Sequence, residues 1–352
     1  HSGLHARPAA VLAGLARKFD SDIRLVKGDE SANAKSVLGI MNLNVGFRDP
    51  VTLEAGGPDA QEAINILAPA VKNGLGEEGA GASGPPIFAP ASVAQAAINA
   101  PPPRPRSDDP NILLGATAAP GLAVGNVHQL RRSEIEVDEE GSGNPLAERA
   151  ALDRAIAQSA MELEALQARL HGESDPGKAA IFAAHQELLG DPDLLDMAQE
   201  AMNNGFSAGY AWQTAINTQA GRLEEMSNEL LAMRANDLRD VGRRVLSHLA
   251  GVQIEDTLVV PLNTILIAED LAPSDVATLD RDRVVGFATT LGGATSHVAI
   301  LARALDLPAL AGIEARALDL PNGTPLILDA TQARIQLNPR PEEIAYIVGM
   351  LR

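Results

Sequence analysis

Two histidines of this chain stand in short motifs whose residue types suit phosphate chemistry. His5 lies within residues 3–10 (GLHARPAA), and His297 ends residues 292–297 (GGATSH). Each motif places an imidazole where a helix is expected to begin. The unpaired N–H groups and the positive dipole end of a helix start favour a bound phosphate. Two such histidine sites in one chain predict a phosphoryl relay.

The first motif predicts a helix that begins near Arg7 or Pro8. Proline suits the first turn because its φ is already helical and its missing N–H would have no partner there. Apolar residues then recur at helical spacing, namely Val11, Leu12, Leu15, Ala16 and Phe19. His5 would precede this helix, and the Arg7 guanidinium would hold phosphoryl oxygens and spread the charge that builds during transfer.

The second motif combines close backbone approach, helix capping and a nucleophile. Gly292 and Gly293 allow the backbone to come close to a phosphate, because glycine carries no Cβ. Thr295 and Ser296 can cap the helix that follows. His297 in the first turn of that helix supplies a nitrogen nucleophile.

The first motif, together with residues 35–41 (KSVLGIM), resembles HPr, the histidine phosphocarrier of the bacterial phosphotransferase system. The resemblance implies that His5 is phosphorylated on Nδ1, with Arg7 beside it. It also implies that Ser36, at a helix start, is a regulatory serine. We expect negative charge at Ser36 to slow phosphoryl transfer by like-charge repulsion, and added salt to weaken that effect. The alternative is that Ser36 only caps its helix.

The second motif belongs to a longer stretch, residues 291–312, that resembles the phosphohistidine domain of enzyme I, pyruvate phosphate dikinase and phosphoenolpyruvate synthase. This resemblance implies phosphorylation of His297 on Nε2. From about residue 113 the chain follows the amino-terminal half of enzyme I, including residues 115–123 (GATAAPGLA) and 234–240 (RANDLRD). An HPr-like segment followed by enzyme I is the order of multiphosphoryl transfer proteins, whereas the dikinase and the synthase would carry an ATP-binding domain there.

The resemblance implies two folds joined by a linker. The first is an α+β HPr-like open-faced sandwich, with strands near 22–26 and 51–55, a last helix at 58–73, and its first strand missing. The second is an α/β phosphohistidine domain with an inserted helical bundle; apolar runs at 258–260, 264–268, 284–287 and 326–328 predict strands of this domain. The expected divisions are an HPr-like domain (1–75), a Gly/Ala/Pro-rich linker (76–111), the phosphohistidine domain (112–144 and 251–340), the helical HPr-docking subdomain (145–250) and the start of a helix that leads to a phosphoenolpyruvate-binding domain (341–352).

We expect the chain to be a fragment of a longer polypeptide. Full enzyme I continues into a phosphoenolpyruvate-binding barrel, and the Mg²⁺ used in that chemistry is expected only with the barrel. No cofactor is therefore expected in this segment, and turnover of phosphoenolpyruvate is not expected from it alone.

The resemblance also assigns supporting roles in the helical region. Arg234 and Asp237 match family positions near the docking surface and near the resting histidine, although a helical i, i+3 ion pair is the alternative. His185 lies on the apolar face of its helix, so a packed core histidine competes with a docking role. Val276 replaces a threonine that supports the histidine in some relatives. The acidic residues expected to supply negative charge for docking are Glu173, Asp175, Asp191 and Asp193.

Composition narrows the function further. The 352 residues carry 46 acidic and 28 basic side chains, a net charge of −18, and the acidic excess lies beyond residue 75. Nucleic acid is an unfavourable ligand for such a chain. The absence of cysteine excludes disulfide and thiolate chemistry. No apolar run is long enough to span a bilayer, so a cytoplasmic location without membrane insertion is expected.

These observations predict a transferase that passes phosphate from phosphoenolpyruvate to His297, then to His5, and then to a IIA domain of a sugar transport system. The predicted partners are the chain's own HPr-like domain docked on the helical subdomain, the IIA acceptor and the carboxy-terminal domain of enzyme I that binds phosphoenolpyruvate and dimerises. A regulatory phospho-switch, as in nitrogen-branch systems, is the alternative. A dikinase-like enzyme is a more distant alternative.

Overall fold

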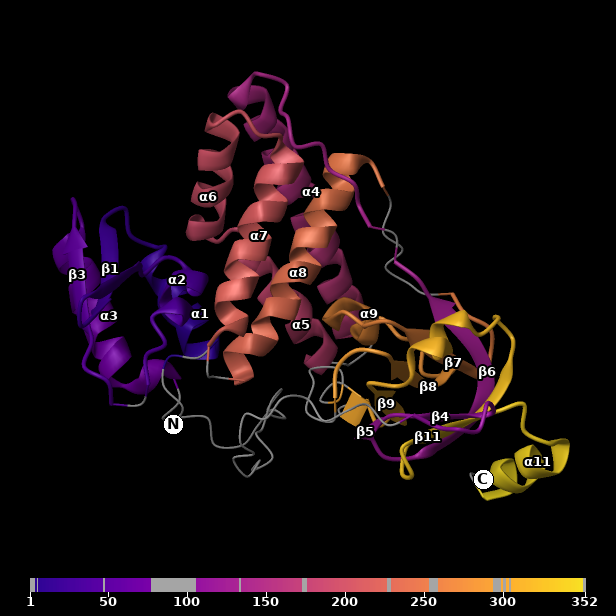
Figure 1. Cartoon of the computed structure of the whole chain (residues 1–352). Helices are drawn as coiled ribbons and strands as arrows, with labels where there is room; N and C mark the ends of the chain where they lie inside the picture. Colours follow the sequence, from indigo (N-terminus) through magenta and orange to yellow (C-terminus); the bar gives the residue numbers. More distant parts are fainter. Residues whose placement is uncertain are drawn as a thin grey trace. The chain divides into compact units, whose positions relative to one another are not determined.

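The computed structural model describes residues 4, 6–46, 48–76, 106–132, 134–172, 176–226, 229–252, 259–293, 299, 302–303 and 305–350. These residues fall into two compact units (Figure 1). Unit 1 comprises residues 1–85 and 135–254, and unit 2 comprises 86–134 and 255–352. Within the described ranges, no helix combines the length and apolar composition needed to cross a bilayer.

The first part of unit 1 packs helices against a three-stranded antiparallel sheet whose order is β2-β1-β3 (indigo in Figure 1). Its elements are α1 (Ala6–Ala16), β1 (Asp22–Lys27), β2 (Glu30–Asn33), α2 (Val37–Asn42), β3 (Thr52–Gly56), α3 (Ala60–Lys72) and the 3-10 turn η1 (Gly74–Gly76). The core holds Leu12, Ile23, Leu25, Ile40 and Leu67, each fully buried. The sequence does not predict strand β2, because its residues, ESAN, have no apolar alternation.

The second part of unit 1 is helical. Its helices are α4 (Pro145–Gly172), α5 (Pro176–Leu189), α6 (Pro192–Asn203), α7 (Ala208–Glu224) and α8 (Glu229–Ala250). Helices α7 and α8 pack closely around Trp212, which is fully buried and donates from Nε1 to the carbonyl of Gly242 at 3.2 Å. A Cβ at Gly242 would lie 2.8 Å from the side chain of Ile216, so glycine is required at this contact.

Unit 2 is built on an eight-stranded mixed sheet in the order β4-β11-β10-β6-β7-β8-β9-β5. Strands β6 to β9 run parallel to one another, and the remaining pairs are antiparallel. The strands are β4 (Ile112–Leu114), β5 (Ala116–Ala119), β6 (Leu122–Leu130), β7 (Thr264–Ala268), β8 (Val284–Thr289), β9 (Ala309–Ala311), β10 (Pro325–Asp329) and β11 (Arg334–Leu337), with α9 (Pro273–Ala277), η2 (Ala315–Asp319) and α11 (Pro341–Met350). The sheet joins strands that precede the helical region in sequence with strands that follow it, and β6 pairs directly with β7.

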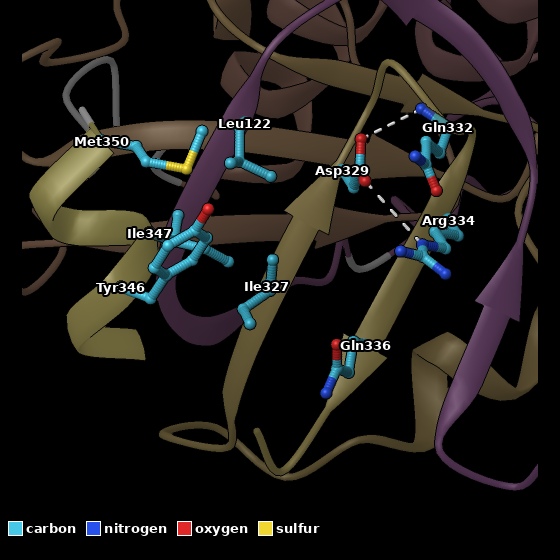
Figure 2. A pocket seen from close by; sticks show the side chains of 9 residues that line it. All are labelled: Leu122, Ile327, Asp329, Gln332, Arg334, Gln336, Tyr346, Ile347 and Met350. Atoms are coloured by element: carbon cyan, nitrogen blue, oxygen red, sulfur yellow. Dashed lines mark hydrogen bonds and ion pairs between the residues drawn. The ribbon is translucent and has the colours of Figure 1, made fainter. Parts of the chain in front are cut away.

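A hollow of about 320 Å³ lies beside helix α11 in unit 2 (Figure 2). Its lining includes Leu122, Ile327 and Tyr346 together with the ion pair between Asp329 and Arg334, whose nearest N and O atoms are 3.8 Å apart. The Asp329 carboxylate also accepts from the backbone N–H of Gln332. Because its one described cation already faces a carboxylate, this hollow is a poor phosphate site.

Candidate functional site

The two candidate phosphorylated histidines, His5 and His297, lie outside the described residues, as do Thr295 and Ser296. What the structure describes is the surroundings of each motif. Helix α1 begins at Ala6, one residue before the predicted start, so the backbone of Arg7 stands in its first turn. The backbone of Leu4, just before His5, donates to the carbonyl of Val45 at 2.9 Å, which ties this motif to the segment after α2.

The turn that leads toward His297 is held on two sides in unit 2. The Leu291 carbonyl accepts from the Thr289 hydroxyl at 2.9 Å and from the Gly312 N–H at 3.2 Å, while the Leu291 N–H donates to the Glu269 carbonyl at 2.9 Å. Gly292 has a φ of +82°, which favours glycine. A Cβ at Gly293 would meet no heavy atom within 4 Å. The glycine pair therefore follows a fixed turn and leaves open space at Gly293.

Ser36 caps helix α2 and is completely buried. Its Oγ accepts from the Gly39 N–H at 2.7 Å, which satisfies an otherwise unpaired donor at the helix start. The Ser36 hydroxyl in turn donates to Asp191 Oδ1 at 2.7 Å, and the Leu38 N–H donates to Asp191 Oδ2 at 3.1 Å. The first part of unit 1 thus contacts the helical part through the N-terminus of α2.

The carboxylate of Asp191 accepts hydrogen bonds at the N-termini of two helices, α2 and α6. It is the N-cap of α6, where Oδ1 accepts from the Asp193 N–H at 3.1 Å, and it also binds the start of α2. Burial raises the pKa of Asp191, against the lowering effect of the hydrogen bonds from Ser36 and Leu38. Burial likewise raises the pKa of Asp193. Further negative charge at this contact would be unfavourable.

Polar pairs surround the contact between Ser36 and Asp191. Arg17 Nη1 lies 2.9 Å from Glu187 Oε2 on α5, and Arg17 Nε donates to the Lys35 carbonyl at 2.8 Å. Asn42 Nδ2 donates to Gln219 Oε1 on α7 at 3.0 Å. Sequence reasoning missed Glu187 and Gln219. Only the charge of Glu187, opposite to that of Arg17, could have indicated the first of them.

The structure brings together His185, Arg234 and Asp237 in the helical part. His185 is 1% exposed, and its Nε2 lies 3.2 Å from Asp237 Oδ1, while Arg234 Nη1 lies 2.9 Å from Asp237 Oδ2. The ring of Phe182 stands edge-on to the imidazole, with centroids 5.9 Å apart. Both alternatives from the sequence, a packed histidine and an i, i+3 ion pair, are present in one network. These contacts link α5 to α8.

Asp237 should contribute stability that is lost in acid. Burial raises its pKa, but the His185 hydrogen bond and the Arg234 guanidinium outweigh burial and hold the pKa of Asp237 below its ordinary value. A depressed native pKa stabilises the fold above the unfolded pKa of about 3.9, and this stability is lost as pH falls through the native pKa. We expect Asp237→Asn to destabilise the helical part by roughly 2 kcal/mol at pH 7, and by progressively less as the pH falls below about 3.9.

The fluorescence of Trp212, the only tryptophan in the chain, would report this unfolding transition during urea titration. Asp153→Asn is the matched control, because Asp153 pairs with Arg149 at 2.9 Å on the surface of α4. That exposed pair should contribute less than about 1 kcal/mol. An Asp237→Asn penalty that is the same at pH 7 and pH 3 would contradict the assigned role of the ionised carboxylate.

The sequence also pointed to Val276, Glu173 and Asp175 as residues near the site. Val276, which replaces the supporting threonine of some relatives, is fully buried in α9. Glu173 and Asp175, expected to charge the docking helix, lie outside the described residues. Among the residues that are described, no group of three or more histidine, aspartate or glutamate side chains is arranged to hold a metal ion.

Three family models match the chain, each over a different region. "PTS HPr component phosphorylation site" matches residues 1–73, "PEP-utilising enzyme, N-terminal" matches 114–234, and "PEP-utilising enzyme, mobile domain" matches 260–333. The first match covers the three-stranded part of unit 1. The others cover most of the helical part and much of the sheet unit. These folds and matches define a protein of the HPr and enzyme I class of the phosphotransferase system.

Individual relatives agree with these matches. The chain is 40% identical to a multiphosphoryl transfer protein of Rhodobacter capsulatus over 91% of this chain and 38% of the relative. It is 38% identical to a multiphosphoryl transfer protein of Xanthomonas campestris pv. campestris over 96% of this chain and 40% of the relative. A solution structure of enzyme I matches 68% of this chain and 97% of its own, with a TM-score of 0.57 and 31% identity.

The chain belongs to the phosphotransferase-system family of HPr and enzyme I proteins, with an HPr domain followed by the amino-terminal part of enzyme I. It spans about 40% of the length of the multiphosphoryl transfer proteins that it matches.

Proposed function

We propose that this chain is a covalent phosphoryl relay between two of its own histidines. His297 receives phosphate from phosphoenolpyruvate bound to the carboxy-terminal domain of an enzyme I, His5 takes it from His297, and a IIA domain of a sugar transport system accepts it from His5. The observation that carries this proposal is the contact in unit 1 between Ser36 of the HPr domain and Asp191 of the helical part, at 2.7 Å. Docking of the carrier on this region is what transfer between the two domains requires.

The proposed step between the histidines is a direct displacement at phosphorus. The lone pair of His5 Nδ1 attacks the phosphorus on Nε2 of His297, the new P–N bond forms, and the old P–N bond returns its electron pair to the His297 ring. Both partners are imidazole nitrogens of similar basicity, so no proton shuttle is required. Positioning and stabilisation of the phosphoryl oxygens then account for the rate. In our proposal Arg7 and the first N–H groups of α1 supply that stabilisation at His5, and the backbone at Gly292 and Gly293 supplies it at His297.

Phosphorylation of the purified chain tests this function. The chain would be incubated with phosphoenolpyruvate, Mg²⁺ and a separately expressed carboxy-terminal domain of enzyme I. We expect phosphate that is labile in acid and stable in base, as phosphohistidine is, in the peptides that contain His297 and His5. Omitting phosphoenolpyruvate is the control. Acid-stable phosphate alone, or labelling of neither peptide, would contradict the proposal.

A further inference from the structure

Gly39 of helix α2 is buried against the start of α6. A Cβ at this position would lie 2.6 Å from Asp193 Oδ2 and 3.1 Å from Ser36 Oγ. Non-bonded heavy atoms are most stable at about 3.5–4.0 Å, so a side chain at position 39 must displace the Asp193 carboxylate. Glycine is therefore the residue that allows α2 and α6 to approach this closely.

A displaced Asp193 carboxylate would leave a position that the start of α6 favours. It stands in the first turn of α6, where the helix dipole favours an anion. The Asp193 N–H is at the same time bound by Asp191, whose other hydrogen bonds hold Ser36 and Leu38. The carboxylate that a Cβ at position 39 displaces therefore lies beside the contacts that bind the start of α2.

We propose that Gly39 and Asp193 form a size filter at the docking surface. The helical part accepts a helix that begins with a capping serine and carries glycine three residues later, and it disfavours a helix with a side chain at that position. The partner class is an HPr-type domain with this Ser-x-x-Gly start, whether in the same chain or in another molecule. The inference rests on the proposed relay and adds the residue pair that selects the carrier.

Transfer between two differently inactivated full chains would test the filter. The donor is the His5→Ala chain, phosphorylated on His297, and the acceptor is the His297→Ala chain with or without Gly39→Ala or Gly39→Leu. Every acceptor also carries Asp193→Ala, so that a substitution at position 39 leaves docking within the acceptor itself nearly unchanged. Single-turnover rates would be measured against acceptor concentration. The donor's own HPr domain competes equally with every acceptor, so ratios between acceptors are informative.

We expect Gly39→Ala to raise the half-saturating acceptor concentration by about tenfold, and Gly39→Leu to raise it further, because overpacking a fitted contact is unfavourable. The maximal rate should change by less than about twofold, because position 39 acts on docking and not on near-attack geometry. Alanine favours a helix interior over glycine, so these acceptors should remain folded, which circular dichroism would verify.

Gly14→Ala is the matched control, since Gly14 lies in α1 and a Cβ there would meet no heavy atom within 4 Å.

The decisive combination is Gly39→Ala in the acceptor with Asp193→Ala in the donor. Removing the carboxylate should abolish most of the penalty at position 39. An equal penalty with either donor, or no penalty with the native donor, would overturn the filter while leaving the relay intact. A native pair that transfers no phosphate would overturn the relay and the filter together.

Discussion

The His297→Ala chain should carry no phosphate on His5 when a carboxy-terminal enzyme I domain and phosphoenolpyruvate are supplied, whereas the His5→Ala chain should accumulate phosphate on His297. The expected loss in the first variant is complete within detection, because a covalent relay cannot proceed without its first nucleophile. The loss in the second is confined to the step after His297. Quenched-flow labelling followed by peptide mapping would assign phosphate to each histidine over time.

The order of labelling makes this prediction specific. In the unmodified chain, phosphate on His297 should rise before phosphate on His5. His128→Ala provides the control, because His128 lies in β6 of the sheet, outside both motifs. Both active-site variants should unfold at the same temperature as the unmodified chain. Normal labelling of His5 in the absence of His297 would show that the relay runs in another order.

Ser36→Asp should slow transfer between His297 and His5 by roughly a hundredfold, since juxtaposed like charges cost several kcal/mol at an interface. The structure gives the reason. Ser36 and Asp191 are both fully buried, and their oxygens are 2.7 Å apart, so a carboxylate at position 36 would face a buried carboxylate of the helical part. Aspartate caps a helix about as well as serine does, so α2 itself should be preserved. Phosphorylation of Ser36 should act in the same direction.

Two variants distinguish repulsion between positions 36 and 191 from a general effect of added charge. Asp191→Asn should restore a large part of transfer in the Ser36→Asp chain, because it removes the opposing charge. Ser31→Asp adds the same charge to the exposed strand β2 and should leave transfer nearly unchanged.

Burial of the contact between Ser36 and Asp191 also revises the salt dependence expected from the sequence. Buried pairs are screened weakly, so added salt should restore only a small part of the rate. Equal rates for Ser36→Asp and the unmodified chain would leave Ser36 as a helix cap only.

Local sequence is sufficient for the elements whose signals are short-range. The proline and apolar spacing after His5 predict α1, and β1, β3 and α3 lie within a residue or two of their predicted limits. Ser36 is predicted at a helix start, and it is the N-cap of α2. In these cases the capping group, the turn and the apolar period are all encoded within a few residues. Strand β2 lacks such a signal, because it is stabilised by pairing with β1 and not by its own apolar residues.

The family and both candidate histidines could also be predicted from the sequence, because those motifs are contiguous. The contacts between distant residues depend instead on tertiary packing. Asp191 meets Ser36 across 155 positions, Glu187 meets Arg17 across 170, and His185 meets Asp237 across 52. None of these pairs follows from helical or strand periodicity, because each depends on how separate helices pack. Asp191 could be read from sequence as a source of negative charge, but its binding to two helix starts required the packing of α2 against α6. The close approach of Gly39 to Asp193 likewise exists only once those helices are docked, since side-chain contacts across an interface are fixed by shape and not by spacing along the chain.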